Sequence, residues 1–405
     1  MVNVAILGFG VVGSGTAEVL TENLTLIEAR IHKKLNIKYI LDLRDFPDSP
    51  FADRVIHDFN IILEDPEVTL VAEMMGGSHP AYDFSIACLR AGKSVVTSNK
   101  EVVANFGDEL LAVAKENNVR YMFEASVGGG IPIIRPLAND LAANQVLSID
   151  GILNGTTNYI LTQMGTTGAA FSDALKEAQA KGYAEANPSA DIDGIDAARK
   201  ITILAALSYG VLLDPNKIYT EGITKITTSD MKIASELGYA IKLIGHCEKI
   251  GDKVLAMVSP RLIPASNPLH TIDDVFNGIL VDTDMLGATM FYGRGAGKLP
   301  TASAVVGDII DIAKSPENDP AFPMFTKACD CKIADIADYR CRNMLVLEGN
   351  LKENGAEIDS LPVKALEVFV DNGRTAIITE EITEKQCSDL CTSLGDKLLS
   401  RIRVL

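Results

Sequence analysis

The sequence predicts an α/β protein in which a doubly wound parallel sheet precedes a mixed α+β region and a small C-terminal module. Over the first third of the chain, short apolar runs alternate with helix-like stretches, and a glycine pattern directly follows the first run. After about residue 130, longer β-like segments mix with helices. We therefore expect three domains, comprising residues 1–130 together with about 300–315, residues 131–299, and residues 320–405.

Composition narrows the class of protein before any motif is considered. With 405 residues, of which 47% are hydrophobic, the chain can bury more than one core. A net charge of -17 opposes nonspecific binding to nucleic acid or anionic lipid, so we expect neither partner. No apolar run approaches the roughly 20 residues that span a bilayer, and no basic segment with a cleavage site precedes the first strand. We expect a cytoplasmic protein, whose seven scattered cysteines are reduced thiols.

The first strand, Val2–Leu7, leads directly into a glycine pattern and then into a helix-like stretch. This context predicts a dinucleotide-binding loop, because the glycines permit a tight turn, close approach of the backbone to a pyrophosphate, and helix–strand packing. The cofactor-binding residues expected here are Gly8, Phe9, Gly10, Val11, Val12 and Gly13. Further strands are expected at residues 37–43, 70–75, 94–98 and 120–125, and helices at 80–91 and 106–117.

Two side chains after the second strand compete for the adenosine ribose. Asp42 would accept hydrogen bonds from a 2'-hydroxyl and favour NAD, whereas Arg44 would pair with a 2'-phosphate and favour NADP. Either side chain is also compatible with a solvated loop charge.

The stretch GYAEANPSADIDGIDAARK, residues 182–200, places three carboxylates before a lysine. Apolar residues at helical spacing after Gly194 predict a helix with one buried face. Asp196 and Lys200, four positions apart, then project from the same side of that helix. Taken alone, this pattern favours a surface ion pair contributing about 0.3–0.5 kcal/mol.

The same stretch, together with GFGVVG, TSNK, EASVGGGIPI, LNGTTNYIL and YGRGAGKLPTASAVVGD, resembles the homoserine dehydrogenase family. The motifs occur in order from Met1 to about Ala313. The resemblance implies a Rossmann domain followed by a catalytic and dimerisation domain. It also implies reversible, nicotinamide-dependent interconversion of L-aspartate 4-semialdehyde and L-homoserine, a step toward threonine, methionine and isoleucine. Two other classes of protein are alternatives: a different semialdehyde reductase of this architecture, and a non-catalytic NAD-binding sensor.

The family resemblance assigns roles to the residues of these motifs. It also favours NADP over NAD, because the family associates an arginine at the end of the second strand, here Arg44, with the adenosine phosphate. Lys200 is the expected proton donor, and Lys100 is expected beside the nicotinamide and the substrate. Gly182, Glu185 and Asp196 are expected to contact the substrate, with Asp191 holding the lysine or a water. These roles are chemically consistent, because reducing an aldehyde creates alkoxide character that an ammonium stabilises, while the substrate's amino group requires carboxylates.

Two glycine-rich segments receive further roles from the resemblance. EASVGGGIPI is expected to bind Na⁺ through backbone oxygens of Glu124, Val127, Gly129 and Ile131, and a hinge between domains is compatible with that role. In the last motif, the backbone of Gly297 is expected to close over the nicotinamide before a helix from about Thr301 returns to the first domain.

The cysteines and histidines predict no soft-ligand metal site. Cys329 and Cys331, and Cys387 and Cys391, are paired in sequence, but none of the five histidines is near them, so we expect ordinary core thiols. His246 and Cys247 are expected to pack within an apolar helix.

The tail after about residue 315 resembles the end of an ACT regulatory domain. Its strands are expected at 343–349, 365–370, 375–379 and 399–404, with a helix at 384–394. The glycine-containing turn that binds an amino-acid effector in such domains is not recognisable, so we expect the module to serve assembly and not threonine feedback. The assembled protein is expected to be a homodimer or a homotetramer.

Overall fold

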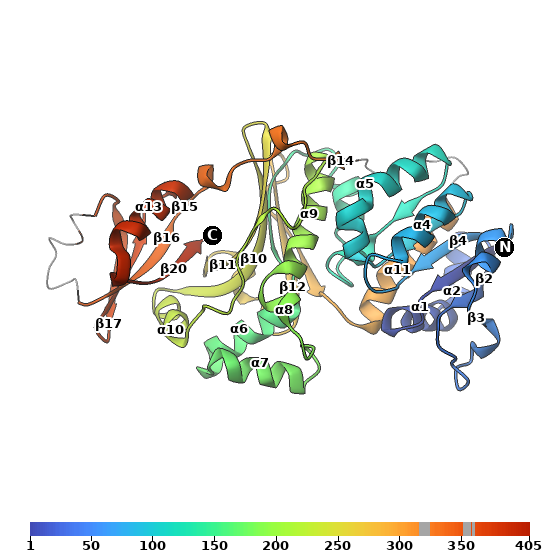
Figure 1. Cartoon of the computed structure of the whole chain (residues 1–405), viewed down its shortest axis with the longest axis horizontal. Helices are drawn as coiled ribbons and strands as arrows, with labels where there is room; N and C mark the ends of the chain where they lie inside the picture. Colours follow the sequence, from blue (N-terminus) through green and yellow to red (C-terminus); the bar gives the residue numbers. More distant parts are fainter. Residues whose placement is uncertain (316–324, 351–357, 359–360) are drawn as a thin grey trace. The chain divides into compact units, whose positions relative to one another are not determined.

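The computed structural model describes residues 1–315, 325–350, 358 and 361–405 (Figure 1). Its contacts divide the chain into two compact units. The first unit comprises Met1–Gln145, Thr202–Pro215 and Phe291–Ala328, and the second comprises Val146–Ile201, Asn216–Met290 and Cys329–Leu405. Within the described residues, no helix combines the length and the apolar character needed to cross a membrane.

The first unit is built on a parallel sheet with the strand order β3-β2-β1-β4-β5-β6. This order reverses between β1 and β4, and the carboxyl ends of the strands on either side of such a reversal form a binding crevice. The predicted doubly wound fold is thus confirmed. The strands are β1 (Val2–Leu7), β2 (Leu35–Leu41), β3 (Val55–Ile56), β4 (Val68–Glu73), β5 (Ser94–Thr97) and β6 (Tyr121–Met122).

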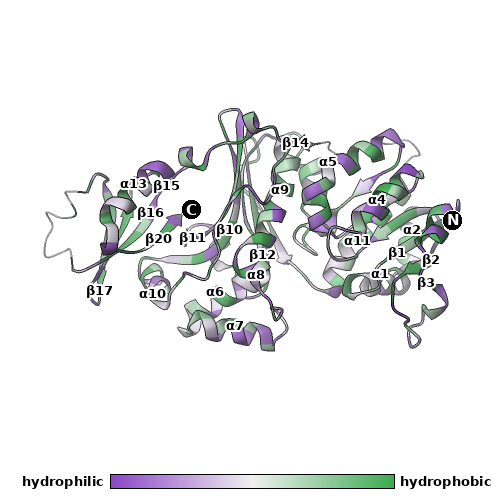
Figure 2. Cartoon of the chain, viewed as in Figure 1, coloured by the Kyte–Doolittle hydropathy of each residue, from purple (hydrophilic) through white to green (hydrophobic). Residues whose placement is uncertain are grey.

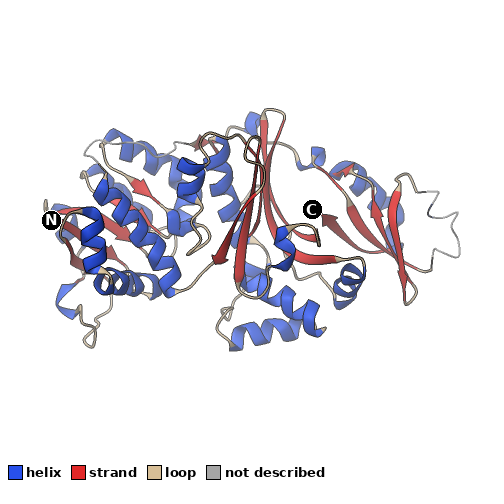
Figure 3. Ribbon diagram, turned by 180° about the vertical axis from the view of Figure 1, so that it is seen from behind, coloured by secondary structure: helices blue, strands red, loops and turns tan. Residues whose placement is uncertain are grey.

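Helices lie on both faces of this sheet (Figure 3), and the strands between them are largely apolar (Figure 2). The helix predicted from about Thr301 begins slightly earlier, at Lys298, and packs against α1, where a Cβ on Gly15 would lie 2.9 Å from Lys298. The helices are α1 (Val11–Glu22), α2 (Leu24–Ile31), α3 (Phe59–Glu64), α4 (Ala81–Arg90), α5 (Lys100–Glu116) and α11 (Lys298–Lys314).

The second unit contains a large mixed sheet with the strand order β13-β12-β7-β10-β11-β20-β16-β18-β17. Its centre is a long antiparallel pair, β10 (Tyr239–Ile250) and β11 (Lys253–Pro264). The other strands of this sheet that precede the tail are β7 (Val146–Ile152), β9 (Tyr219–Thr220), which pairs with β11, β12 (Phe276–Thr283) and β13 (Thr289–Arg294), most of which belongs to the first unit. The helices are α6 (Gly155–Thr167), α7 (Phe171–Ala180), α8 (Ser189–Ile192), α9 (Ile195–Tyr209), whose second half belongs to the first unit, and α10 (Thr228–Glu236).

The tail forms the elements predicted for it, and these join the same large sheet. The strand order in the tail is β20-β16-β18-β17. Strand β16 pairs with β20 and with β18, β17 pairs with β18, and all three pairings are antiparallel. Such an order is typical of a split βαβ arrangement. The segment between β16 and β17, to which the expectation about the effector turn applies, lies largely outside the described residues. The elements are β16 (Asn343–Glu348), β17 (Ala365–Asp371), β18 (Arg374–Thr379), α13 (Glu384–Leu394) and β20 (Leu398–Val404).

Two predictions about histidine and cysteine residues were wrong. His246 and Cys247 lie in strand β10 and not in a helix, because a short apolar run does not distinguish a buried strand from a buried helix. His246 is also more than packing, since its Nδ1 lies 2.8 Å from Asp150 Oδ1 on the neighbouring strand β7. Cys329 and Cys331 are exposed and joined as a disulfide, so they are neither reduced nor core thiols.

Candidate active site

The loop between β1 and α1 has the backbone shape that a dinucleotide requires. Gly8 adopts a φ of 87°, which favours glycine. A Cβ on Gly13 would lie 1.9 Å from the carbonyl oxygen of Gly8, so only glycine permits this approach of helix to loop. At Gly10 a Cβ would meet nothing within 4 Å, which leaves open space beside the loop. Helix α1 begins at Val11 and directs its N-terminal amides to that space.

Asp42 and Arg44, the two candidates for recognising the ribose, contact each other. Arg44 donates from Nε to Asp42 Oδ1 at 2.9 Å and from Nη2 to Oδ2 at 3.0 Å. The backbone N–H of Phe9 also donates to Asp42 Oδ2, at 2.8 Å, which ties this carboxylate to the glycine loop. Arg44 is the main cause that lowers the pKa of Asp42 to about 2, with the backbone N–H donors also contributing.

A cavity of about 500 Å³ lies beside this pair, at the carboxyl ends of the strands. Gly8, Gly10, Asp42 and Arg44 line it together with residues of the loop after β4, among them Met75 and Gly76. The cavity thus unites the glycine loop with both ribose candidates. Its size and place agree with the predicted site for a dinucleotide.

Lys100 occupies the first position of helix α5. The preceding residue, Asn99, caps this helix, because its side-chain oxygen accepts hydrogen bonds from the backbone N–H groups of Glu101 and Val102. The sequence analysis places the start of this helix at residue 106, six residues too late, because it does not take Asn99 as a helix cap. Lys100 therefore lies at a capped helix end, at the carboxyl edge of the parallel sheet.

In the second unit, Lys200 is buried and fixed at its ammonium. Nζ donates to Asp196 Oδ2 and to the backbone oxygen of Leu153, both at 2.7 Å. Asp196 and Lys200 lie on one face of α9, and their side chains are 8% and 10% exposed. The alternative interpretation as a surface ion pair is therefore wrong, because both side chains are about nine-tenths buried. A buried pair of this kind requires compensating hydrogen bonds.

Asn154 is a member of this cluster that sequence reasoning did not single out. Its Nδ2 donates to Asp191 Oδ1 at 2.7 Å and to Asp196 Oδ2 at 2.9 Å, while its Oδ1 accepts from the backbone N–H of Thr157 at 2.9 Å. One side chain therefore caps α6 and joins two carboxylates from different segments. A cap signal was present, since Asn precedes the helical stretch in LNGTTNYIL.

Gly182 and Glu185 lie in an exposed loop between α7 and α8. Gly182 has a φ of 75°, and the loop is tied to the start of α6 because Thr156 Oγ1 donates to the carbonyl oxygen of Tyr183 at 2.7 Å. The backbone oxygen of Glu185 accepts from Gln179 Nε2 at 3.1 Å. The structure thus brings Lys200, Asp196 and Asp191 together, while Glu185 is exposed on the adjoining loop.

The predicted cation segment surrounds a buried carboxylate. The side chain of Glu124 accepts hydrogen bonds from the backbone N–H groups of Ile133, Ile134 and Arg135, at 2.6 to 2.9 Å, and from Arg135 Nε at 3.1 Å. The Glu124 carboxylate is thereby fully engaged. Any cation here would take the backbone oxygen of Glu124 and not its side chain.

Asp308 supplies a second buried carboxylate at this segment. Its Oδ2 accepts from the backbone N–H of Glu124 at 2.9 Å, and its Oδ1 lies 3.7 Å from Arg135 Nη1. Burial raises the pKa of Asp308 well above its ordinary value, so this side chain brings no excess of negative charge to the segment. Val127, Gly129 and Ile131 are buried on the same turn, and a Cβ on Gly129 would lie 2.5 Å from the carbonyl oxygen of Gly295. Backbone oxygens are the kind of hard donor that such a cation takes.

Gly297, the residue expected to close over the nicotinamide, is the N-cap of α11 and has a φ of 129°. Only glycine adopts this backbone conformation readily. It belongs to the same unit as the glycine loop and Lys100.

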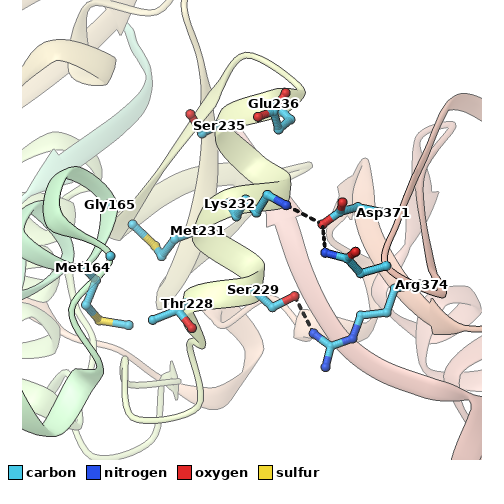
Figure 4. Close-up of a pocket in the computed structure, with 12 residues that line it drawn as sticks. Met164, Gly165, Thr228, Ser229, Met231, Lys232, Ser235, Glu236, Asp371 and Arg374 are labelled. Carbon is cyan, nitrogen blue, oxygen red and sulfur yellow. Dashed lines mark hydrogen bonds and ion pairs between the residues drawn. The ribbon is translucent and has the colours of Figure 1, made fainter.

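A further cavity, of about 640 Å³, lies in the second unit and contains none of the predicted site residues. Figure 4 shows its lining from the end of α6, from α10 and from the turn between β17 and β18. Lys232 on α10 pairs with Asp371 on that turn at 2.7 Å, and Arg374 donates to Ser229. These contacts attach the tail to the helical layer of the second unit.

Comparison with known proteins gives a consistent result over both units. A family model described as "Homoserine dehydrogenase, NAD binding domain" matches residues 8–124, and one described as "Homoserine dehydrogenase" matches residues 132–310. A homoserine dehydrogenase of Neisseria gonorrhoeae is 46% identical over 79% of this chain and 74% of its own. That of a Synechocystis species is 41% identical over 84% and 81%.

Solved structures extend the similarity to the tail. The crystal structure of a homoserine dehydrogenase from Thiobacillus denitrificans superimposes with a TM-score of 0.91 at 35% identity, covering 100% of this chain and 98% of that one. A hyperthermophilic archaeal homoserine dehydrogenase in complex with NADPH gives 0.66 at 31% identity over 78% of this chain and 99% of that one. This chain belongs to the homoserine dehydrogenase family, and it is an NAD(P)-dependent oxidoreductase that interconverts L-aspartate 4-semialdehyde and L-homoserine.

Proposed function

We propose that Lys200 is the proton donor when the aldehyde of L-aspartate 4-semialdehyde is reduced. The observation that carries this proposal is the buried ammonium of Lys200, held between Asp196 Oδ2 and the Leu153 carbonyl, both at 2.7 Å. When bound, the reduced nicotinamide supplies a hydride to the aldehyde carbon. Lys200 Nζ gives a proton to the aldehyde oxygen, which becomes the hydroxyl of homoserine, and Asp196 holds the ammonium in position beforehand.

The carboxylates near Lys200 are proposed to bind the amino group of the substrate. Asp191 and Asp196 share the two N–H donors of Asn154, so both are held in fixed positions. Glu185, on the exposed loop after Gly182, would complete the site from the solvent side once substrate binds. The backbone of Gly182 would contact the same substrate, because its open, left-handed turn leaves room there.

The coenzyme is proposed to be NADP, with NAD as the alternative. Its pyrophosphate would lie on the backbone of Gly8, Phe9, Gly10, Val11, Val12 and Gly13. Arg44 lines the cavity and is 64% exposed, so it is free to turn from Asp42 to a 2'-phosphate. The archaeal relative bound to NADPH supports this choice. Lys100 and Gly297 would contact the nicotinamide end.

A monovalent cation, with Na⁺ as the first choice, is proposed at the backbone oxygens of Glu124, Val127, Gly129 and Ile131. The burial of Val127, Gly129 and Ile131 on one turn supports it, because backbone oxygens kept from water there could serve as hard donors. Turnover and thermal stability should then differ between Na⁺, K⁺ and tetramethylammonium at matched ionic strength. Identical behaviour in all three salts would leave this segment as a hinge only.

We propose three domains for this chain. Residues 1–130 with about 300–315, 131–299 and 320–405 are proposed as the coenzyme, catalytic and ACT-like domains. The order β20-β16-β18-β17 supports the last of these. We also propose that the protein is a cytoplasmic homodimer or homotetramer. Its reaction would be a step in the biosynthesis of threonine, methionine and isoleucine.

A substrate comparison tests the proposed recognition of the amino group. The full-length enzyme should oxidise NADPH rapidly with L-aspartate 4-semialdehyde and at least about a hundredfold more slowly, in kcat/KM, with succinate semialdehyde, which lacks the amino group. Equal efficiency with both aldehydes would contradict the role of Asp191, Asp196 and Glu185.

A further inference from the structure

Glu73 is a fully buried carboxylate at the carboxyl end of β4, in the first unit. It is not one of the glycine-loop, lysine or carboxylate residues that carry the proposed reaction. Burying an ionisable group without a counter-charge destabilises a fold, so such a residue requires a specific explanation.

The two oxygens of Glu73 are bound by two different loops. Oε1 accepts the backbone N–H of Met75 at 2.7 Å, within the loop after β4. Oε2 accepts the hydroxyl of Thr97 at 2.6 Å, at the end of β5. The backbone oxygen of Glu73 also accepts the N–H of Ser98, at 3.3 Å. One residue therefore joins the ends of two adjacent strands.

Asn99 completes this connection. Its N–H donates to Thr97 Oγ1 at 2.9 Å, and its Nδ2 donates back to the carbonyl oxygens of Met75, at 3.2 Å, and Gly77, at 2.8 Å. The same side chain caps α5, whose first residue is Lys100. A closed network thus runs from Glu73 through Thr97 and Asn99 to both loops.

The two loops carry different parts of the coenzyme site. Met75 and Gly76 line the cavity that also contains Gly8 and Arg44, whereas the loop after β5 leads into Lys100. We propose that Glu73 is a positioning residue, whose buried carboxylate fixes the wall of the coenzyme cavity and the start of α5 relative to each other. This inference rests on the proposed role of Lys100 beside the nicotinamide.

The hydrogen bonds from the two loops oppose the cost of burying Glu73. Burial raises the pKa of Glu73 to about 7, against the hydrogen bonds from Thr97, Met75 and Asn99, which lower it. Its ionisable neighbour on β6 is Tyr121, whose pKa is raised by burial and then by Glu73. The carboxyl group thus depends on the loop donors for its stabilisation.

The test compares Glu73→Gln, Glu73→Met and Thr97→Val in the full-length enzyme. Glu73→Gln keeps the shape and one acceptor, whereas Glu73→Met removes both. We expect the KM for NADPH to rise and kcat to fall together, with kcat about tenfold or more lower in Glu73→Met and less affected in Glu73→Gln, because small misplacements of reacting groups reduce rates strongly. Thr97→Val should resemble Glu73→Gln.

Lys93→Met is the matched control. Lys93 is buried at the opposite, amino end of the same strands, where its Nζ donates to the carbonyl oxygens of Asp65, at 2.6 Å, and Val68, at 2.8 Å. It should lower the Tm while leaving kcat and the KM for NADPH within about twofold of the parent. If Glu73→Met, at an equal loss in Tm, changes these constants no more than Lys93→Met, Glu73 is merely structural and the proposal is overturned.

A double-mutant cycle with Lys100→Met separates this inference from the proposed function. If Glu73 acts on kcat through Lys100, Glu73→Met should lower kcat much less in the Lys100→Met background than in the parent. Additive losses would overturn the proposal for Lys100 positioning. If Lys100→Met alone keeps the parental kcat, the catalytic role of Lys100 fails, and the NADPH KM of the Glu73 variants still decides whether Glu73 fixes the cavity wall.

Discussion

The ammonium of Lys200 lies 2.7 Å from Asp196 Oδ2, one helical turn away on α9. The pair is buried, and the second contact of the ammonium is a backbone carbonyl at 2.7 Å. Burial of an ammonium between two acceptors gives it a single position, which a proton donor to a developing alkoxide requires.

Replacing Lys200 by Met should lower kcat by at least about a hundredfold, the scale for losing a positioned proton donor, while NADPH still binds. Steady-state assays and coenzyme titration measure the two effects. Lys176→Met is the control, because Lys176 is an exposed lysine that pairs with Asp173 at 3.7 Å. Near-parental turnover of the Lys200 variant would show that Lys200 is not the proton donor.

Asn154→Ser separates helix capping from carboxylate positioning. Serine keeps the cap of α6 but loses the two amide donors to Asp191 and Asp196. We expect kcat/KM for the semialdehyde to fall roughly tenfold to a hundredfold, with stability changed by less than about 1 kcal/mol. A large loss of Tm without a selective loss of kcat/KM would mean that Asn154 serves α6 alone.

Arg44→Ala should raise the KM for NADPH by about tenfold or more and leave NADH nearly unchanged, because a charge-assisted contact to the 2'-phosphate is lost. Asp42→Ala should instead weaken NADH. The structure adds a condition, since Arg44 must leave Asp42 to reach a phosphate. The KM values of both coenzymes in both variants decide between the two side chains, and equal use of the coenzymes by the parent would mean that neither discriminates.

The stability of the protein should depend on pH through Glu73. Its pKa of about 7 in the fold exceeds the ordinary value of 4.5, so the folded state retains a proton that the unfolded chain releases. The contribution of Glu73 to stability is therefore complete below pH 4.5 and is lost as the pH rises to about 7. Glu73→Gln does not titrate, so its Tm relative to the parent should rise between pH 5 and pH 8, by an amount corresponding to about 1–3 kcal/mol. A constant difference in Tm across this range would show that Glu73 does not titrate there.

Local spacing was sufficient to predict much of the chain. The strand at Val2–Leu7, the glycine loop and the helix from Glu384 to Leu394 were all predicted correctly, because periodicity and turn residues act within a few positions. The placement of Asp196 and Lys200 on one helical face also follows from their spacing alone.

Tertiary structure decided which of these groups meet and which are buried. Asn154 reaches Asp191 and Asp196 across 37 and 42 residues, a pairing that no local pattern encodes. Burial distinguishes the Lys200–Asp196 pair from a surface ion pair and raises the pKa of Glu73. The pairing of β10 with β7 likewise brings His246 beside Asp150. Sequence by itself determined the elements and their chemistry, whereas contacts between distant segments and exclusion of water depend on how those elements pack, and these set the position and protonation of each group.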